Sequence, residues 1–140
     1  MSQRPAPLPA PRTLTRHLPM ELLAPDAAVP IDTTVDYTSR DPHALSVAFH
    51  LGDGDPVVWR LDREMVLAGA CAPTGLGDVH VLPVDGGRVL LRLGPVGLHA
   101  AVLCASDPLT DLAHETYALV PRGEEERHID WRPLLAALRG

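Results

Sequence analysis

The stretch that decides the fold covers residues 57–83 and reads VVWRLDREMVLAGACAPTGLGDVHVLP. Alternating apolar residues at its start predict a strand. Asp62 is placed to cap a short helix after that strand, because its carboxylate can accept hydrogen bonds from the first exposed amides. Gly69 predicts the end of the helix in a left-handed conformation. A glycine-rich corner at 75–77 then leads into a second strand.

The segments before this stretch predict an antiparallel meander, since apolar and polar residues alternate along them. Residues 13–23 predict a strand that is either an edge strand or bulged at Pro19, because proline cannot donate to a ladder. Residues 24–30 are expected to form a loop. Residues 31–37 and 45–51 show the period-2 pattern of half-buried strands, and a polar turn ends the meander.

The segments directly after the stretch predict three more strands. Residues 78–84 and 88–93 flank the sequence Asp-Gly-Gly at 85–87, which is a tight hairpin signal. Residues 98–104 are apolar on both faces, as expected of a strand that lies centrally or under a helix.

Helices are predicted at the C-terminal end. Asp107 followed by Pro108 predicts a helix start, and apolar residues continue at helical spacing to Val120. Residues 124–126 are three glutamates and predict a solvated loop. Asp130 is placed to cap a last helix. The apolar stripe of that helix consists of Trp131, Leu134, Leu135 and Leu138. Strands first and helices last predict an antiparallel α+β domain.

Length and composition restrict the class of protein. The chain has 140 residues, which fits one domain over residues 13–140, preceded by a disordered tail over 1–12 that holds four prolines. Its net charge is −6, and all 12 positive residues are arginine. This acidic chain lacks the basic footprint of a nucleic-acid binder or a membrane anchor. It has no apolar run long enough to span a membrane and no secretory signal, so direct membrane insertion is not expected and the default compartment is the cytoplasm.

No motif in the sequence carries known chemistry. The two cysteines and seven histidines lack metal-ligand spacing, and no serine lies in a nucleophile elbow. The glycines at 75–77 lack the third glycine and the preceding strand of a dinucleotide fingerprint. The sequence therefore predicts no enzyme, no cofactor and no metal. Three alternatives stay open: a metal held by His50, His80 and His99, a small hydrolase that uses Asp78 or a histidine, and a Cys71 nucleophile.

Residues with two interpretations lie at the strand–helix junction and in the last helix. Trp59 and Arg63 are either an exposed anchor for a partner or a core tryptophan with a capping arginine. The stripe of the last helix packs either on its own sheet or on another subunit. The candidate partner-binding residues are Trp59, Arg63, Glu64, Trp131, Leu135 and Leu138.

Several motifs agree with one family in order and spacing over about residues 13–138. They are Val58-Trp59, Arg63-Glu64-Met65-Val66-Leu67, Gly69, Pro73-Thr74-Gly75 and Gly77-Asp78-Val79-His80-Val81. The flanking motifs are Val35-Asp36-Tyr37, Asp41-Pro42-His43-Ala44 before Phe49, and Glu126-Arg127-His128-Ile129-Asp130. With these motifs the chain resembles the SsgA-like family, the sporulation and cell-division proteins of filamentous actinomycetes.

The resemblance implies two antiparallel sheets in an arrangement similar to the Whirly-type single-stranded-DNA-binding fold, with C-terminal helices, assembled as a trimer. It also implies a non-enzymatic adaptor without a cofactor, located in the cytoplasm at division septa. Such adaptors place septa, help recruit the tubulin-like division protein FtsZ, or influence later cell-wall steps. The alternative is single-stranded nucleic-acid binding by fold analogy, which the net charge of −6 opposes.

Overall fold

The computed structural model describes residues 8–139. The strands in this part of the chain are β1 (Thr13–His17), β2 (Met20–Ala24), β3 (Ala27–Thr38), β4 (Ala44–His50), β5 (Val57–Asp62), β6 (Thr74–Leu76), β7 (Val79–Val84), β8 (Arg88–Leu93) and β9 (Ala100–Ala105). The helices are α1 (Arg63–Gly69), α2 (Ser106–Leu119), the 3₁₀ helix η1 (Glu125–His128) and α3 (Arg132–Leu138). Strands precede the long helix, so the predicted antiparallel α+β class is confirmed.

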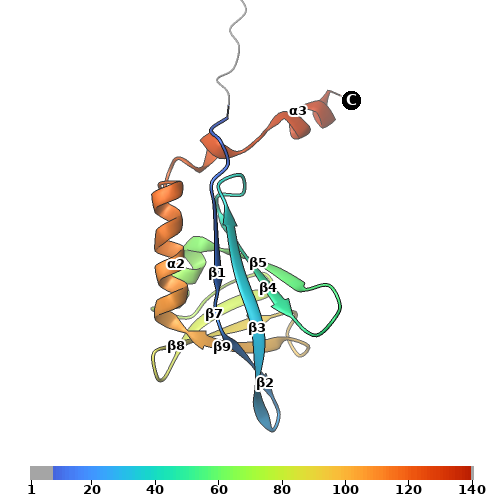
Figure 1. The fold of residues 1–140 in the computed structure, drawn as a ribbon, viewed down its shortest axis with the longest axis vertical. Helices are drawn as coiled ribbons and strands as arrows, with labels where there is room; N and C mark the ends of the chain where they lie inside the picture. Colours follow the sequence, from blue (N-terminus) through green and yellow to red (C-terminus); the bar gives the residue numbers. More distant parts are fainter. Residues whose placement is uncertain (1–7, 140) are drawn as a thin grey trace, which may run out of the picture.

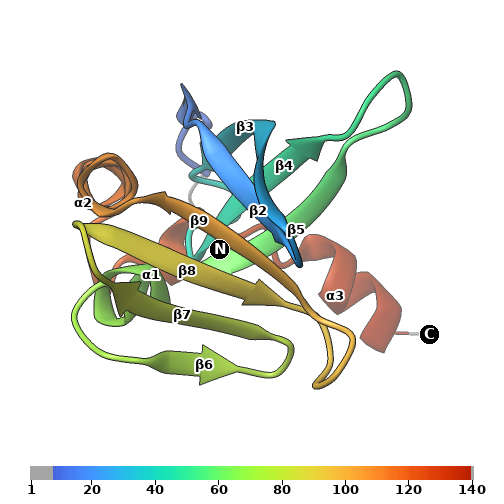
Figure 2. The same ribbon diagram turned by 90° about the horizontal axis from the view of Figure 1, so that it is seen from below.

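The strands form one connected antiparallel sheet in the order β5-β4-β3-β2-β9-β8-β7-β6, with β1 paired to β3 off this path. The long strand β3 joins two groups of strands. Its C-terminal half pairs with β1 and β4, and its N-terminal end pairs with β2, which continues through β9. Figure 2 shows the two groups turned relative to each other, with α2 and α1 on one side of the β7–β9 strands.

The predicted single strand over residues 13–23 is wrong in detail, because the structure has two strands there. The strand is interrupted at Leu18 and Pro19. Leu18 is buried, and its N–H donates to the Thr33 carbonyl at 3.1 Å. Pro19 has no N–H to continue a ladder, so β1 and β2 pair with different parts of β3.

The predicted loop over residues 24–30 is also wrong. Only a short turn separates β2 from β3, and residues 27–30 pair with β2 in a hairpin that projects from the body (Figure 1). The alternation predicted over 31–37 is confirmed, since its inward residues are all buried. These are Ile31, Thr33, Val35 and Tyr37.

The N-terminal tail predicted over residues 1–12 falls mostly outside the described residues, which begin at residue 8. The last residue of this predicted tail, Arg12, is hydrogen-bonded to Ser39, which follows β3. The Arg12 N–H donates to the Ser39 hydroxyl, and the Ser39 N–H donates to the Arg12 carbonyl, both at 2.8 Å. Fixed contacts therefore begin one residue before the predicted domain boundary.

Helix α1 begins as predicted and ends differently. The Asp62 carboxylate accepts the N–H groups of Glu64 and Met65 at 2.8 and 3.1 Å, which confirms the cap. Gly69 does not have a left-handed conformation, and the helix runs through it. A Cβ at Gly69 would collide with the Val81 side chain and lie 2.9 Å from the Val81 carbonyl oxygen. This glycine is therefore needed for the close packing of α1 on β7.

Helix α2 begins one residue before the predicted cap. Its first residue is Ser106, so Asp107 lies in the first turn, where a carboxylate complements the positive end of the helix dipole. The predicted stripe is confirmed as buried, and α2 packs against α1, β8 and β9. Its members are Leu109, Leu112, Ala113, Thr116 and Val120. As the low aromatic content indicates, the core between helices and sheet is mainly aliphatic.

Candidate functional site

A buried polar cluster lies where β3, α1, α2 and η1 meet, with Arg63 at its centre. The Arg63 side chain is only 1% exposed. Its Nη1 donates to the Tyr37 hydroxyl and the Thr116 hydroxyl, each at 3.3 Å, and its Nη2 donates to Glu125 Oε2 at 3.4 Å. The guanidinium also stacks on the Tyr117 ring, 3.8 Å from its centroid. A buried cation requires such partners, because its desolvation costs several kcal/mol.

Each member of the cluster is positioned by its own element. Arg63 is the first residue of α1, and its N–H donates to the His43 carbonyl at 2.8 Å. Tyr37 lies near the end of β3 and donates its hydroxyl proton to the Pro42 carbonyl at 3.0 Å. Burial raises the pKa of Tyr37 to about 12, although the positive charge of Arg63 opposes this rise. Tyr37 therefore stays a neutral donor at physiological pH.

Glu125 is the one member that the sequence placed wrongly, since residues 124–126 predicted a solvated loop. Its residue exposure is 8%, and its Oε1 accepts the Gly123 N–H at 2.6 Å. Burial acts to raise the pKa of Glu125. Hydrogen bonds from its own N–H and the Gly123 N–H, together with the Arg63 guanidinium, more than offset this effect and hold the pKa below its ordinary value. The carboxylate therefore stays charged opposite Arg63.

The interpretation of Arg63 as an exposed anchor is wrong, because its guanidinium is enclosed by the chain's own residues. Trp59 lies on β5, is half-buried and packs against the core. Glu64 is exposed and forms an ion pair with Arg122 at 2.8 Å, and the Arg122 guanidinium lies 5.0 Å from the centroid of the Tyr117 ring. Whether Trp59 and Glu64 contact a partner stays a prediction.

The apolar stripe of α3 is exposed to solvent in this chain. Trp131, Leu134 and Leu135 are between 46% and 50% exposed, and Leu138 is 74% exposed. Figure 1 shows α3 extending away from the sheet, so the stripe does not pack on its own sheet. Asp130 accepts the Arg132 N–H at 3.0 Å beside the start of the helix, and hydrogen bonds from Arg132 lower the pKa of Asp130 to about 2.

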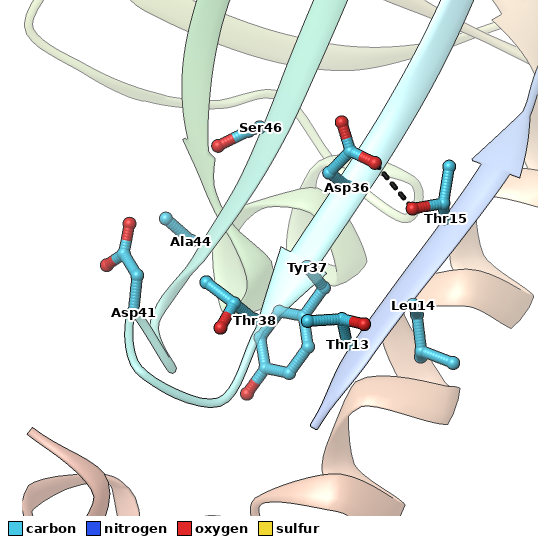
Figure 3. A pocket seen from close by; sticks show the side chains of 9 residues that line it. All are labelled: Thr13, Leu14, Thr15, Asp36, Tyr37, Thr38, Asp41, Ala44 and Ser46. Carbon is cyan, nitrogen blue, oxygen red and sulfur yellow. Dashed lines mark hydrogen bonds between the residues drawn. The ribbon is translucent and has the colours of Figure 1, made fainter. Parts of the chain in front are cut away.

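A polar hollow of about 300 Å³ opens on the outer face of β1, β3 and β4. Figure 3 shows hydroxyl and carboxylate side chains around it, with Thr15 donating to Asp36 at 2.6 Å. Asp41, at its edge, is held by the Arg60 guanidinium at 2.6 Å. Both carboxylates are thus already paired, and the one buried ionisable side chain in the lining is Tyr37, whose hydroxyl donates to the Pro42 carbonyl. The sequence did not single it out, because outward polar residues occur on any solvent-facing strand.

The histidines considered for metal binding are not brought together. His50 lies on β4 with its ring nitrogen 3.1 Å from the Thr34 hydroxyl, whereas His80 and His99 line another hollow beyond β7 and β8. Among residues 8–139 no three histidine, cysteine or acidic side chains are grouped to hold a metal. Cys71 is exposed, and burial raises the pKa of the Cys104 thiol to about 12. In the same part of the chain no helix is long and apolar enough to span a membrane.

Comparison with known proteins relates this architecture to one family. The family model described as Streptomyces sporulation and cell division protein, SsgA, matches residues 31–125, a range that includes both Tyr37 and Glu125. The chain is 36% identical over 126 residues to the sporulation-specific cell division protein SsgB of Thermobifida fusca, covering 84% of this chain and 88% of that protein. It is 30% identical over 112 residues to the SsgB of Streptomyces coelicolor, covering 78% and 82%.

Two solved structures share the fold. The crystal structure of an SsgA-like sporulation-specific cell division protein from Thermobifida fusca has a TM-score of 0.79 and 35% identity, over 91% of this chain and 96% of that chain. A structure from a study of SsgB mutations that correlate with longitudinal cell division in sporulating Streptomyces coelicolor has a TM-score of 0.77 and 28% identity, over 85% and 97%. The chain therefore belongs to the SsgA family of sporulation and cell division proteins.

Proposed function

We propose that this protein is a non-enzymatic adaptor in sporulation septation, which positions septa or recruits division and cell-wall proteins through protein contacts. Its relatives are sporulation-specific cell division proteins. The observation that carries the adaptor role is the apolar stripe of α3, which the chain itself leaves uncovered. An exposed apolar face of this kind is typical of an interaction site, and it offers none of the polar groups that catalysis needs.

The proposed partners are division proteins such as FtsZ or a related SsgA-like protein, met in the cytoplasm at the septum. The proposed contacts are Trp131, directly before α3, and Leu135 and Leu138 on α3. Trp59 and Glu64 at the β5–α1 junction form a second group. The chain is also proposed to form a homo-oligomer, a trimer, as the family resemblance implies. We also propose, on the same resemblance, that its strands are arranged as two sheets similar to the Whirly-type fold.

Deletion and localisation test this function. The deletion strain is expected to lack sporulation septa, and a fluorescent fusion is expected to co-localise with the septa. An enzyme without a role in division would not be expected to give this combination of localisation and septation defect. Normal septa and spores in the deletion strain would contradict the proposal, as would a fusion that stays diffuse throughout sporulation.

A further inference from the structure

A cationic hollow of about 110 Å³ lies at one end of the outer face of β7 and β8, lined by His80, Arg92, Gly94, Val96 and His99. His80 and Arg92 are directly opposite each other across the ladder. No carboxylate in residues 8–139 lies within 4.0 Å of these three basic side chains, whereas six other arginines in that range each have one. An unpaired guanidinium between two imidazoles is suited to bind an anion.

Two glycines place the histidines beside Arg92. Gly75 on β6 lies opposite His80, and a Cβ at Gly75 would collide with the His80 ring, whose Nε2 would be 2.7 Å away. Gly94 has φ +119°, and a Cβ there would lie 3.2 Å from the His99 Cα. A larger residue at either glycine would displace one of the two histidines, so the positions of His80 and His99 depend on Gly75 and Gly94.

Large exposed apolar side chains lie in or next to the two turns at this end of the sheet, and one of them, Val96, lines the hollow. Leu76, Val96 and Leu98 are 75%, 98% and 85% exposed, more than the other large apolar side chains of residues 8–139. The Gly94 N–H donates to the Asp78 carbonyl at 2.9 Å, which joins the β6–β7 turn to the β8–β9 turn. Figure 2 shows these two turns side by side. Val96 and Leu98, both in the β8–β9 turn, therefore lie beside the cationic hollow. Leu76 pairs with the buried Val79 and so belongs to the other face of the sheet.

We infer that this end patch, made of His80, Arg92, His99, Val96 and Leu98, docks a partner-protein segment that carries a carboxylate between aliphatic side chains. The hollow is much smaller than the roughly 300 Å³ from which small-molecule pockets begin, but it admits a carboxylate. Arginine binds a carboxylate in a bidentate geometry. Val96 and Leu98 would then pack against the apolar side chains that flank this carboxylate in the partner segment. Asp78 is the one acidic residue of the two turns. The net charge of −6 disfavours a nucleic acid as the occupant.

This inference rests on the adaptor function and gives it a contact surface separate from α3. The test uses the full-length protein and a fluorescein-labelled peptide that alternates leucine and glutamate, with a twin in which glutamine replaces every glutamate. Fluorescence anisotropy is expected to show binding of the glutamate peptide at least tenfold tighter than binding of the twin. Arg92→Gln is expected to weaken that binding at least tenfold, since it removes a charge-assisted hydrogen bond to the carboxylate.

Arg88→Gln is the matched control, because Arg88 lies on the same strand and face at the opposite end and should leave binding unchanged. Leu98→Ser should weaken binding of both peptides, and thermal unfolding verifies that each variant is folded. Equal affinity for the two peptides, or equal effects of Arg92→Gln and Arg88→Gln, would overturn the inference.

Two further outcomes would assign the patch to another occupant and overturn the inference as well. One is a smaller oligomer mass for Leu98→Ser, which would make the patch a contact between copies of this chain. The other is an Arg92-dependent affinity for a labelled single-stranded oligonucleotide. If the peptide fails to bind while the deletion strain still lacks septa, the docking site is wrong and the adaptor function stands.

Discussion

At the scale of single residues, Arg63 is the largest fully buried side chain of residues 8–139, and it carries a charge. Its charge is compensated by Glu125, which lies 62 positions further along the chain. The sequence showed Arg63 beside a helix cap and Glu125 within a run of glutamates. Neither context distinguishes a buried ion pair from two solvated charges. The distinction is made by the long-range contact that brings Glu125 on η1 to Arg63 on α1, which no local pattern records.

Removing the carboxylate of Glu125 is therefore expected to destabilise the fold. Glu125→Gln leaves a buried guanidinium without its counter-charge, and we expect the free energy of unfolding to fall by about 3 kcal/mol. Glu126→Gln is the control, since Glu126 is the exposed neighbour and should change stability by less than about 0.5 kcal/mol. Urea denaturation measures both variants. Equal stability losses would show that the Arg63–Glu125 pair is not what holds η1.

The pH dependence of stability provides a second test at this scale. The pKa of Glu125 is lowered in the folded chain from 4.5, so the folded state binds fewer protons than the unfolded state around that pH. Its stabilising contribution is complete above pH 4.5 and is lost as the pH falls through the folded pKa. The difference in melting temperature between the wild type and Glu125→Gln should shrink between pH 6 and pH 3. A difference that stays constant over this range would contradict a charged Glu125.

At the scale of elements, strands with a clean alternation were predictable and strands without it were not. Residues 31–37 and 88–93 alternate because each strand buries one face, so their inward residues could be read directly. Residues 27–30 are Ala-Ala-Val-Pro and do not alternate between apolar and polar side chains. They still pair with β2 in a hairpin that is mostly exposed. Where neither face is buried, the sequence carries no periodic signal for a strand.

Gly69 illustrates a second limit at this scale. A glycine near a helix end signals either a left-handed cap or a close approach, and the structure shows the approach to Val81. In an exposed helix, alanine in place of glycine stabilises by about 0.5–1 kcal/mol. Here Gly69→Ala should instead destabilise by about 1–3 kcal/mol, because the new methyl group overlaps Val81. Gly54→Ala has open space around it and serves as the control in the same thermal melts. A gain in stability for Gly69→Ala would contradict this packing.

At the scale of the whole molecule, the net charge of −6 opposes nucleic-acid binding, and the exposed apolar surfaces support the proposed protein contacts. Binding of single strands requires neutralisation of phosphates, which a chain of net charge −6 opposes. A labelled single-stranded oligonucleotide is therefore expected to show no binding at micromolar protein and 150 mM salt, measured by fluorescence anisotropy. Micromolar affinity with a steep salt dependence would instead favour the alternative function, single-stranded nucleic-acid binding, over the adaptor function.

The candidate contacts at this scale were only partly predictable. The stripe of α3 could be read from its helical spacing, but spacing does not show whether a stripe faces its own sheet or solvent. The end patch could not be predicted, because its residues come from turns and strands that only the β6–β9 pairing brings together.

Septum formation in complemented deletion strains tests the central claim most directly, that the exposed face of α3 connects this protein to the division machinery. The wild-type gene and Leu51→Ser, which changes an exposed leucine away from α3, are expected to restore regularly spaced septa. Trp131→Ser combined with Leu135→Ser should leave the protein folded and present at normal levels, yet fail to restore septa. Full rescue by this double variant, or normal septation without the protein, would contradict the account.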